Sequence, residues 1–235
     1  MTTRRAGQGS SLGGWRAAAL VVRTGMRAEA RPGVSVLARA GFFADFLLCP
    51  LGIGALVTYA LMLGPAPERS VFAMAFIAGA VFWTLAEYLL HRFFLHGVPP
   101  LRRAHLLHHC APQALIGAPA WLSPLLAIGL FVVTDFVADA ALASGLTSGV
   151  ILGYLAYVCI HYATHHLPNL RWAWLRKLRR AHALHHRSET ACNFGVSTGL
   201  WDVVFRTAAP RPSKATPMPA SRADHSCAPP ENESA

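Results

Sequence analysis

The sequence predicts an all-α integral membrane protein with four transmembrane helices. Hydrophobic residues make up 54% of the 235 positions and charged residues only 14%, and the mean hydropathy is +0.37. In soluble domains about a quarter of the residues are charged. Four apolar runs of nearly spanning length and a one-sided distribution of the basic residues complete the prediction.

The spanning helices are expected where apolar runs approach the ~20 residues that cross a bilayer. Pro65 and Pro67 separate the first pair of runs, and Gly145 is expected to separate the second pair. In chain order, the predicted spans are residues 41–63, 70–90, 121–143 and 146–162.

The spans divide the chain into three regions. Residues 1–40 are Arg-rich and are expected to be partly disordered or to lie on the membrane surface. Residues 41–207 form the predicted membrane domain. Residues 208–235 are rich in Pro, Ser and Ala and predict a disordered tail.

Basic residues lie almost entirely on one side of the predicted spans. Of 21 Lys and Arg, seven precede the first run, three lie between the second and third, and ten follow the fourth, so that only Arg69 falls elsewhere. Both termini and the central loop are therefore expected in the cytosol, and a bacterial inner membrane is the expected location. The net charge of +10 does not indicate nucleic-acid binding, because no zinc-finger or RNP-type spacing accompanies it.

Histidines are concentrated in one part of the sequence. Eleven of the twelve fall between His91 and His186, and the twelfth, His225, lies in the predicted tail and is expected to be inert. Several are spaced i, i+3, i+4, which places imidazoles on one helix face. The eleven histidines from His91 to His186 are expected at the cytosolic ends of the spans or beyond them, where they can converge. The groups are His91 and His96; His105, His108 and His109; His161, His165 and His166; and His182, His185 and His186.

This number of imidazoles predicts a site for two metal ions. Imidazole binds Zn, Fe, Cu and Ni, and ten or more exceed what one ion can use. A structural zinc site closes with four ligands, whereas a redox pair with about five nitrogens each leaves a position for O₂. Three alternatives remain open: an interfacial or solvated basic face, a membrane metal carrier or bis-histidine haem protein, and a di-zinc hydrolase that works without O₂.

Acidic residues near the histidines have several candidate roles. Glu87 lies one helical turn before His91 and could accept a hydrogen bond from its free ring N–H, or could pair with Arg92. Asp45, near the cytosolic end of the first span, is undecided between packing and function. Asp135 and Asp139 are expected toward the far side, where they would serve packing or the outer interface, although an acid within the membrane is also a candidate for function.

Longer strings around these histidines resemble the fatty acid hydroxylase/sterol desaturase superfamily, and within it the fatty acid 2-hydroxylase branch. The resemblance covers roughly residues 41–207. It lies in Glu87-Tyr-Leu-Leu-His91-Arg-Phe-Phe-Leu-His96, His105-Leu-Leu-His108-His109, His161-Tyr-Ala-Thr-His165-His166, His182-Ala-Leu-His185-His186 and Asn193-Phe-Gly-Val-Ser-Thr-Gly-Leu-Trp201-Asp202.

The resemblance implies four transmembrane helices under a cytosolic helical cap that holds a histidine-rich dimetal site. It implies two Fe ions, with Zn as a substitute in isolated protein, and O₂ as co-substrate. A separate cytochrome b5-like or ferredoxin-like protein is expected to deliver the electrons. The implied metal ligands are His91, His96, His105, His108, His109, His161, His165, His182, His185 and His186.

The implied activity is hydroxylation of a lipid acyl chain, as in fatty acid 2-hydroxylation. The alternatives are a sterol or other lipid desaturase or methyl oxidase of the same superfamily, and a non-redox metal-binding membrane protein. Glu87, His166 and Asp202 are expected to support the ligands without binding metal. The Arg- and Trp-rich segment 167–181 is expected either to lie at the headgroup interface or to dock an acidic electron donor.

Overall fold

The computed structural model describes residues 32–63, 66–115, 119–187 and 192–210. Most of the predicted N-terminal segment, nearly all of the predicted tail and His225 lie outside these residues. Every regular element in the described chain is a helix, which confirms the predicted all-α class.

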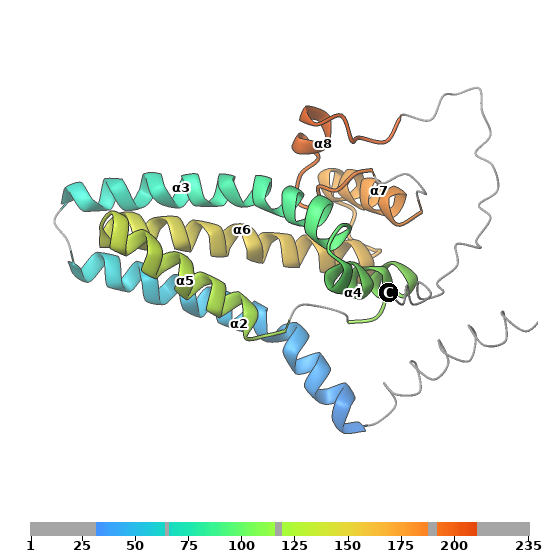
Figure 1. Cartoon of the computed structure of the whole chain (residues 1–235), viewed down its shortest axis with the longest axis horizontal. Coiled ribbons are helices and arrows are strands. Elements are labelled where there is room, and N and C mark those ends of the chain that lie inside the picture. The colour runs from blue at the N-terminus through green and yellow to red at the C-terminus, as the bar shows by residue number, and fades with distance from the viewer. Residues whose placement is uncertain (1–31, 64–65, 116–118, 188–191, 211–235) are drawn as a thin grey trace, which may run out of the picture. The chain divides into compact units, whose positions relative to one another are not determined.

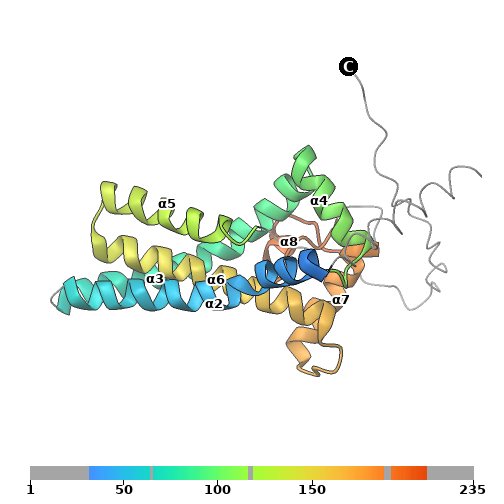
Figure 2. The same ribbon diagram turned by 90° about the horizontal axis from the view of Figure 1, so that it is seen from below.

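Four long helices run side by side, and the shorter ones gather at one end of them (Figures 1 and 2). Within the described chain, the residues from Gly41 onwards form one compact unit. The helices are α2 (Pro32–Leu63), α3 (Ala66–Leu89), the π-helix η1 (Leu90–Leu95), α4 (Pro99–Cys110), α5 (Leu122–Val137), α6 (Ala140–His166), α7 (Ala173–Arg187) and α8 (Leu200–Val204).

Among the described residues, three segments are long and apolar enough to cross a membrane: Arg39–Met62, Arg69–Leu95 and Ala140–His166. Their outer faces, like that of α5, carry large apolar side chains that pack against nothing in the protein. Leu47, Leu51, Ile77 and Ile128 are each at least 60% exposed, and Phe136 is 90% exposed. A soluble protein does not expose so much apolar surface, so the chain is an integral membrane protein.

The third predicted span differs from the prediction. α5 has 16 residues and is therefore about 24 Å long at 1.5 Å per residue, against about 30 Å of hydrocarbon. The predicted break at Gly145 is wrong, because α5 ends at Val137 and α6 begins at Ala140. Asp139 makes this break by accepting a hydrogen bond from the Leu142 N–H at 2.8 Å, which caps α6.

Gly145 instead lies where α6 packs against α3. A Cβ at this position would lie 2.3 Å from the carbonyl oxygen of Phe72, so only glycine permits this approach. Small residues commonly allow membrane helices to pack this closely. The glycine is thus a packing residue inside a continuous helix.

Asp45 has a packing role that the sequence had left open. Its side chain is 6% exposed and accepts hydrogen bonds from the Ser123 hydroxyl at 2.5 Å and the Tyr154 hydroxyl at 2.6 Å. These contacts join α2, α5 and α6. A carboxylate buried between apolar helices needs such donors.

Candidate metal centre

The structure brings ten of the histidines together in two groups of five. Within each group, the candidate ligand nitrogens lie within 4.8 Å of one another. We call them the His91 group and the His108 group. The His91 group contains His91, His96, His105, His109 and His185, and the His108 group contains His108, His161, His165, His182 and His186.

The π-helix η1 brings His91 and His96 to the same site. Its wider turn pairs residues five positions apart, so that His91 and His96 lie nearer to one side than they would in an α-helix. Their ring centroids are 5.2 Å apart. π-Helical turns inside α-helices often occur at functional sites.

Helices α4 and α7 each supply both groups. Residues i and i+4 of an α-helix lie about 40° apart around its axis, and residue i+3 lies on the other side of residue i. In α4 the pair His105 and His109 joins the His91 group, and His108 joins the other. In α7 the pair His182 and His186 joins the His108 group. His185 is the α7 residue that crosses to the His91 group.

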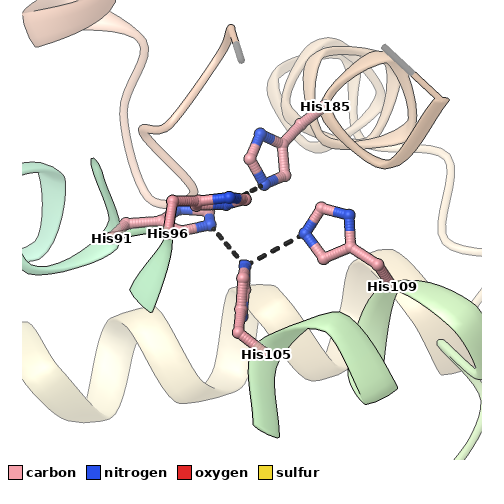
Figure 3. Close-up of side chains that lie close together, drawn as sticks. All are labelled: His91, His96, His105, His109 and His185. Carbon is pink, nitrogen blue, oxygen red and sulfur yellow. Dashed lines mark hydrogen bonds between the residues drawn. The ribbon is translucent and has the colours of Figure 1, made fainter. Parts of the chain in front are cut away.

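The Nε2 atoms within the His91 group point at a common centre (Figure 3). The His91–His105 and His105–His109 Nε2 pairs are 3.0 Å apart, and the His96–His185 pair is 3.2 Å apart. Two nitrogens bound at about 2.1 Å and at right angles to one another would be separated by about 3.0 Å. The donor set and its spacing therefore fit a bound metal ion.

The His108 group has the same spacing. Its Nε2 atoms are 3.1 Å apart between His108 and His161, and 3.2 Å between His161 and His165. The His165–His182 pair is 2.8 Å apart and the His182–His186 pair 3.0 Å. Five imidazole nitrogens at these separations fit a second ion by the same reasoning.

Burial favours the neutral form of the imidazoles that lie beyond the spanning segments. Loss of water, reinforced by neighbouring histidines, lowers the pKa of His96 and of His108 to about 4. The same causes lower the pKa of His109 to about 3 and that of His186 to about 2. Neutral imidazole is the form that binds a metal ion, so the ligand lone pairs are available without proton release.

Two main-chain carbonyls orient ligands of the His91 group. Nδ1 of His91 lies 2.6 Å from the carbonyl oxygen of Phe194, and Nδ1 of His185 lies 2.8 Å from that of Cys192. A carbonyl oxygen can only accept, so each Nδ1 carries the proton and donates it. The lone pair is then on Nε2, which faces the centre of the group.

Glu87 makes neither of the two direct contacts predicted for it, with His91 or with Arg92. It accepts hydrogen bonds at one carboxylate oxygen from the main-chain N–H groups of Val196 at 2.7 Å and Ser197 at 2.9 Å, and at the other from the Ser197 hydroxyl. Arg92 donates to the Tyr88 hydroxyl at 2.7 Å. Three donors from one distant loop satisfy the carboxylate better than a single ring N–H, and spacing along α3 could not reveal this loop.

Asp202 holds the same loop from the other side. One carboxylate oxygen accepts from the Phe194 N–H and the Thr207 hydroxyl, each at 2.8 Å, and the other accepts from the Gly195 N–H at 2.9 Å. A Cβ at Gly195 would lie 2.0 Å from the Thr198 carbonyl oxygen, so the tight loop requires glycine there. Asp202 thus acts through the loop that contacts His91 and His185.

The comparisons agree with this geometry. Residues 76–207 match the fatty acid hydroxylase family. The chain belongs to this family. The resemblance predicted from the histidine strings is confirmed.

Two curated relatives and one solved structure are similar to this member of the family. It is 35% identical to fatty acid 2-hydroxylase from Rattus norvegicus over 156 residues, which cover 61% of this chain and 41% of the relative. It is 31% identical to a dihydroceramide fatty acyl 2-hydroxylase from Arabidopsis thaliana over 138 residues, 55% of this chain and 58% of the relative. The chain thus matches less than two thirds of either relative's length.

The structure of full-length scs7p, of which only the hydroxylase domain is visible, has the same fold. The TM-score is 0.61 at 23% identity, and the alignment covers 72% of this chain and 67% of that chain. At this identity the likeness shows a shared fold.

His166 belongs to neither of the two histidine groups. Its ring stacks on Tyr162 at 4.6 Å between centroids. This agrees with the resemblance, which left His166 out of the implied ligands.

Sequence reasoning gave no role to Cys192, Asn193 or Phe194. Cys192 and Phe194 act through their main-chain carbonyls, and the type of side chain does not reveal such a role. Asn193 lies between them with φ of 53°, a left-handed conformation that asparagine tolerates better than most residues. Its side chain donates to the Ala181 carbonyl at 3.2 Å and accepts from the Ala209 N–H at 2.9 Å. A lone asparagine between two apolar segments was the available signal.

Proposed function

We propose that the protein is a membrane-bound non-haem di-iron monooxygenase that hydroxylates a lipid acyl chain at carbon 2. The observation that carries the proposal is the convergence of two groups of five imidazoles. The two relatives described above, a fatty acid 2-hydroxylase and a dihydroceramide fatty acyl 2-hydroxylase, support the choice of substrate and carbon. A desaturase or methyl oxidase acting on a sterol or another lipid is the alternative within the superfamily.

In this proposal each group of five histidines holds one iron ion. Two bound iron ions would supply, with O₂, the oxidant for a strong C–H bond, which no side chain can provide. The chain's own residues set the geometry of that site. The η1, α4, α6 and α7 histidines bind, the Cys192 and Phe194 carbonyls orient two of them, and the surrounding helices exclude water.

The membrane location favours an acyl substrate. An acyl chain can reach the site from the bilayer along the apolar helices, with its polar head near the cytosolic end. Oxidation close to the head follows from that arrangement, which agrees with 2-hydroxylation.

Electrons come, in this proposal, from a separate cytochrome b5-like or ferredoxin-like protein. The segment at the start of α7 is better explained as an anchor in the headgroup layer than as the donor's docking site. Trp172 and Trp174 are 59% and 49% exposed and stack at 5.9 Å, as expected for an interfacial aromatic pair. Arg179 is engaged with the carbonyls of Leu167 at 2.7 Å and Pro168 at 3.1 Å.

For topology we propose that α5 spans with the other three long helices, so that both termini and the metal centre are cytosolic. The sorting of 20 of 21 basic residues supports this arrangement. Reporter fusions at Gly64 and at Ala235 should report opposite sides of the membrane. If both report the same side, the four-span topology is wrong. The bacterial inner membrane stays a prediction, because the relatives described above are eukaryotic.

The function is tested with purified, iron-loaded protein, a reductase system and acyl lipids. Mass spectrometry should show an acyl chain one oxygen heavier, with the hydroxyl on carbon 2, and ¹⁸O₂ should label it. The same mixture under strict anaerobiosis is the control and should give no product. Oxygen-independent turnover would point to a hydrolase, and a product two hydrogens lighter would point to the desaturase alternative.

A further inference from the structure

The two histidine groups differ in the hydrogen bonds made by Nδ1, the ring nitrogen that faces away from the centre of the group. We infer that residues 192–197, which we call the carbonyl loop, preorganise the metal site of the His91 group only, with Asp202 and Glu87 as positioning residues. The inference rests on the proposed function, because it concerns the same two ions. It predicts one tight and one weak metal site in one protein.

The carbonyl loop is fixed on two sides by buried carboxylates. Glu87, in α3, is 3% exposed, and Asp202, in α8, is 2% exposed. Between them they accept hydrogen bonds from the main-chain N–H groups of four consecutive residues, Phe194, Gly195, Val196 and Ser197. Hydrogen bonds from N–H groups to carboxylates are among the stronger ones in proteins.

The hydrogen bonds to Glu87 and Asp202 determine where the two orienting carbonyls lie. The Phe194 carbonyl belongs to the residue whose N–H is bound by Asp202, and the Cys192 carbonyl precedes it by two residues. If these hydrogen bonds weaken, the imidazoles of His91 and His185 lose the acceptors that set their tautomer and ring orientation. Partners of this kind typically change metal affinity about 10–100-fold.

The His108 group lacks this support in the part of the chain that the structure describes. Nδ1 of His108, of His182 and of His186 is buried there and has no hydrogen-bond partner. Two of the five ligands in the His91 group thus have a carbonyl acceptor at Nδ1, whereas three of the five in the His108 group have a buried Nδ1 without one. Ligands held only by helix packing should bind their ion less tightly than ligands also held by acceptors.

The experiment measures zinc affinity at one group at a time by competition with a chelator. Replacing His161 and His182 by alanine disables the His108 group, and replacing His91 and His105 disables the other. Asp202→Asn is then added to each background. Because the amide must turn its NH₂ toward an N–H donor of the loop, zinc affinity should fall about 10–100-fold in the first background. It should be unchanged in the second.

Asp139→Asn is the matched control, because Asp139 caps α6 away from the histidines and asparagine caps equally well. It should change neither affinity. Glu87→Gln is the milder second variant if circular dichroism shows that Asp202→Asn misfolds, since glutamine can still accept the Val196 and Ser197 N–H bonds. It should lower affinity in the same background by a smaller factor.

An equal loss in both backgrounds, or no loss in the first, would overturn the inference and assign the carboxylates a general structural role. A wild-type protein that binds fewer than two zinc ions per chain would instead contradict the dimetal centre of the proposed function. The two failures are therefore distinguishable in one set of titrations.

Discussion

Alanine at His108 or at His185 should abolish lipid hydroxylation and lower the bound metal from two ions per chain toward one. Each imidazole is one of five nitrogens in its group, and each is at most 6% exposed, so that no water or neighbouring side chain replaces it. The proposed chemistry needs both ions, so loss of either ion removes activity even where the other remains. Elemental analysis and product mass spectrometry on the same preparations would check both statements.

His166→Ala is the matched control for these two variants. It also removes an imidazole at the end of α6, beside His165, but the His166 ring stacks on Tyr162 outside both groups. The activity of this variant should fall by no more than about tenfold, which is the low end of the loss seen when a residue that supports metal ligands is replaced. Two ions should still be bound. Full activity in His108→Ala would show that the histidines do not form the reactive centre.

Protein loaded with zinc alone should be inactive, and exchange of the zinc for iron should restore turnover. Zinc has no redox chemistry, although its affinity for imidazole sites is generally higher than that of Fe²⁺. Zinc should therefore bind readily to the histidines and give no turnover. Turnover would be measured before and after chelation and anaerobic reloading with Fe²⁺. Equal rates with both metals would favour the di-zinc hydrolase interpretation over an oxygenase.

The membrane fold and the ten converging histidines could be predicted from sequence because their signals are local. Apolar runs mark spans, and the spacing i, i+3, i+4 places imidazoles on one helix face. How the ten divide into groups could not be predicted in the same way. His108 and His185 separate from their neighbours because α4 and α7 face each other across the site, and that facing is set by tertiary packing.

The errors at Gly145 and Glu87 have a similar cause. Glycine in an apolar segment indicates either a break or a close contact, and the Phe72 carbonyl against which it packs lies on another helix. Glu87 was placed by its neighbours in α3, whereas its donors lie 109 and 110 residues further along the chain. In neither case does the residue type or its neighbours in sequence identify the distant partner.

The contact between His91 and the Phe194 carbonyl also imposes an order on biosynthesis. The two residues are 103 positions apart, so at about 5–20 residues per second the ribosome makes the second some 5–20 s after the first. For that interval Glu87 lacks its Val196 and Ser197 donors, and His91 lacks its Phe194 acceptor. Under the proposed function, stable capture of the metal ion of the His91 group must wait until residues 192–197 have emerged and folded back. A ribosome stalled before that point should leave a chain that is inserted, helical and unable to retain the ion of the His91 group.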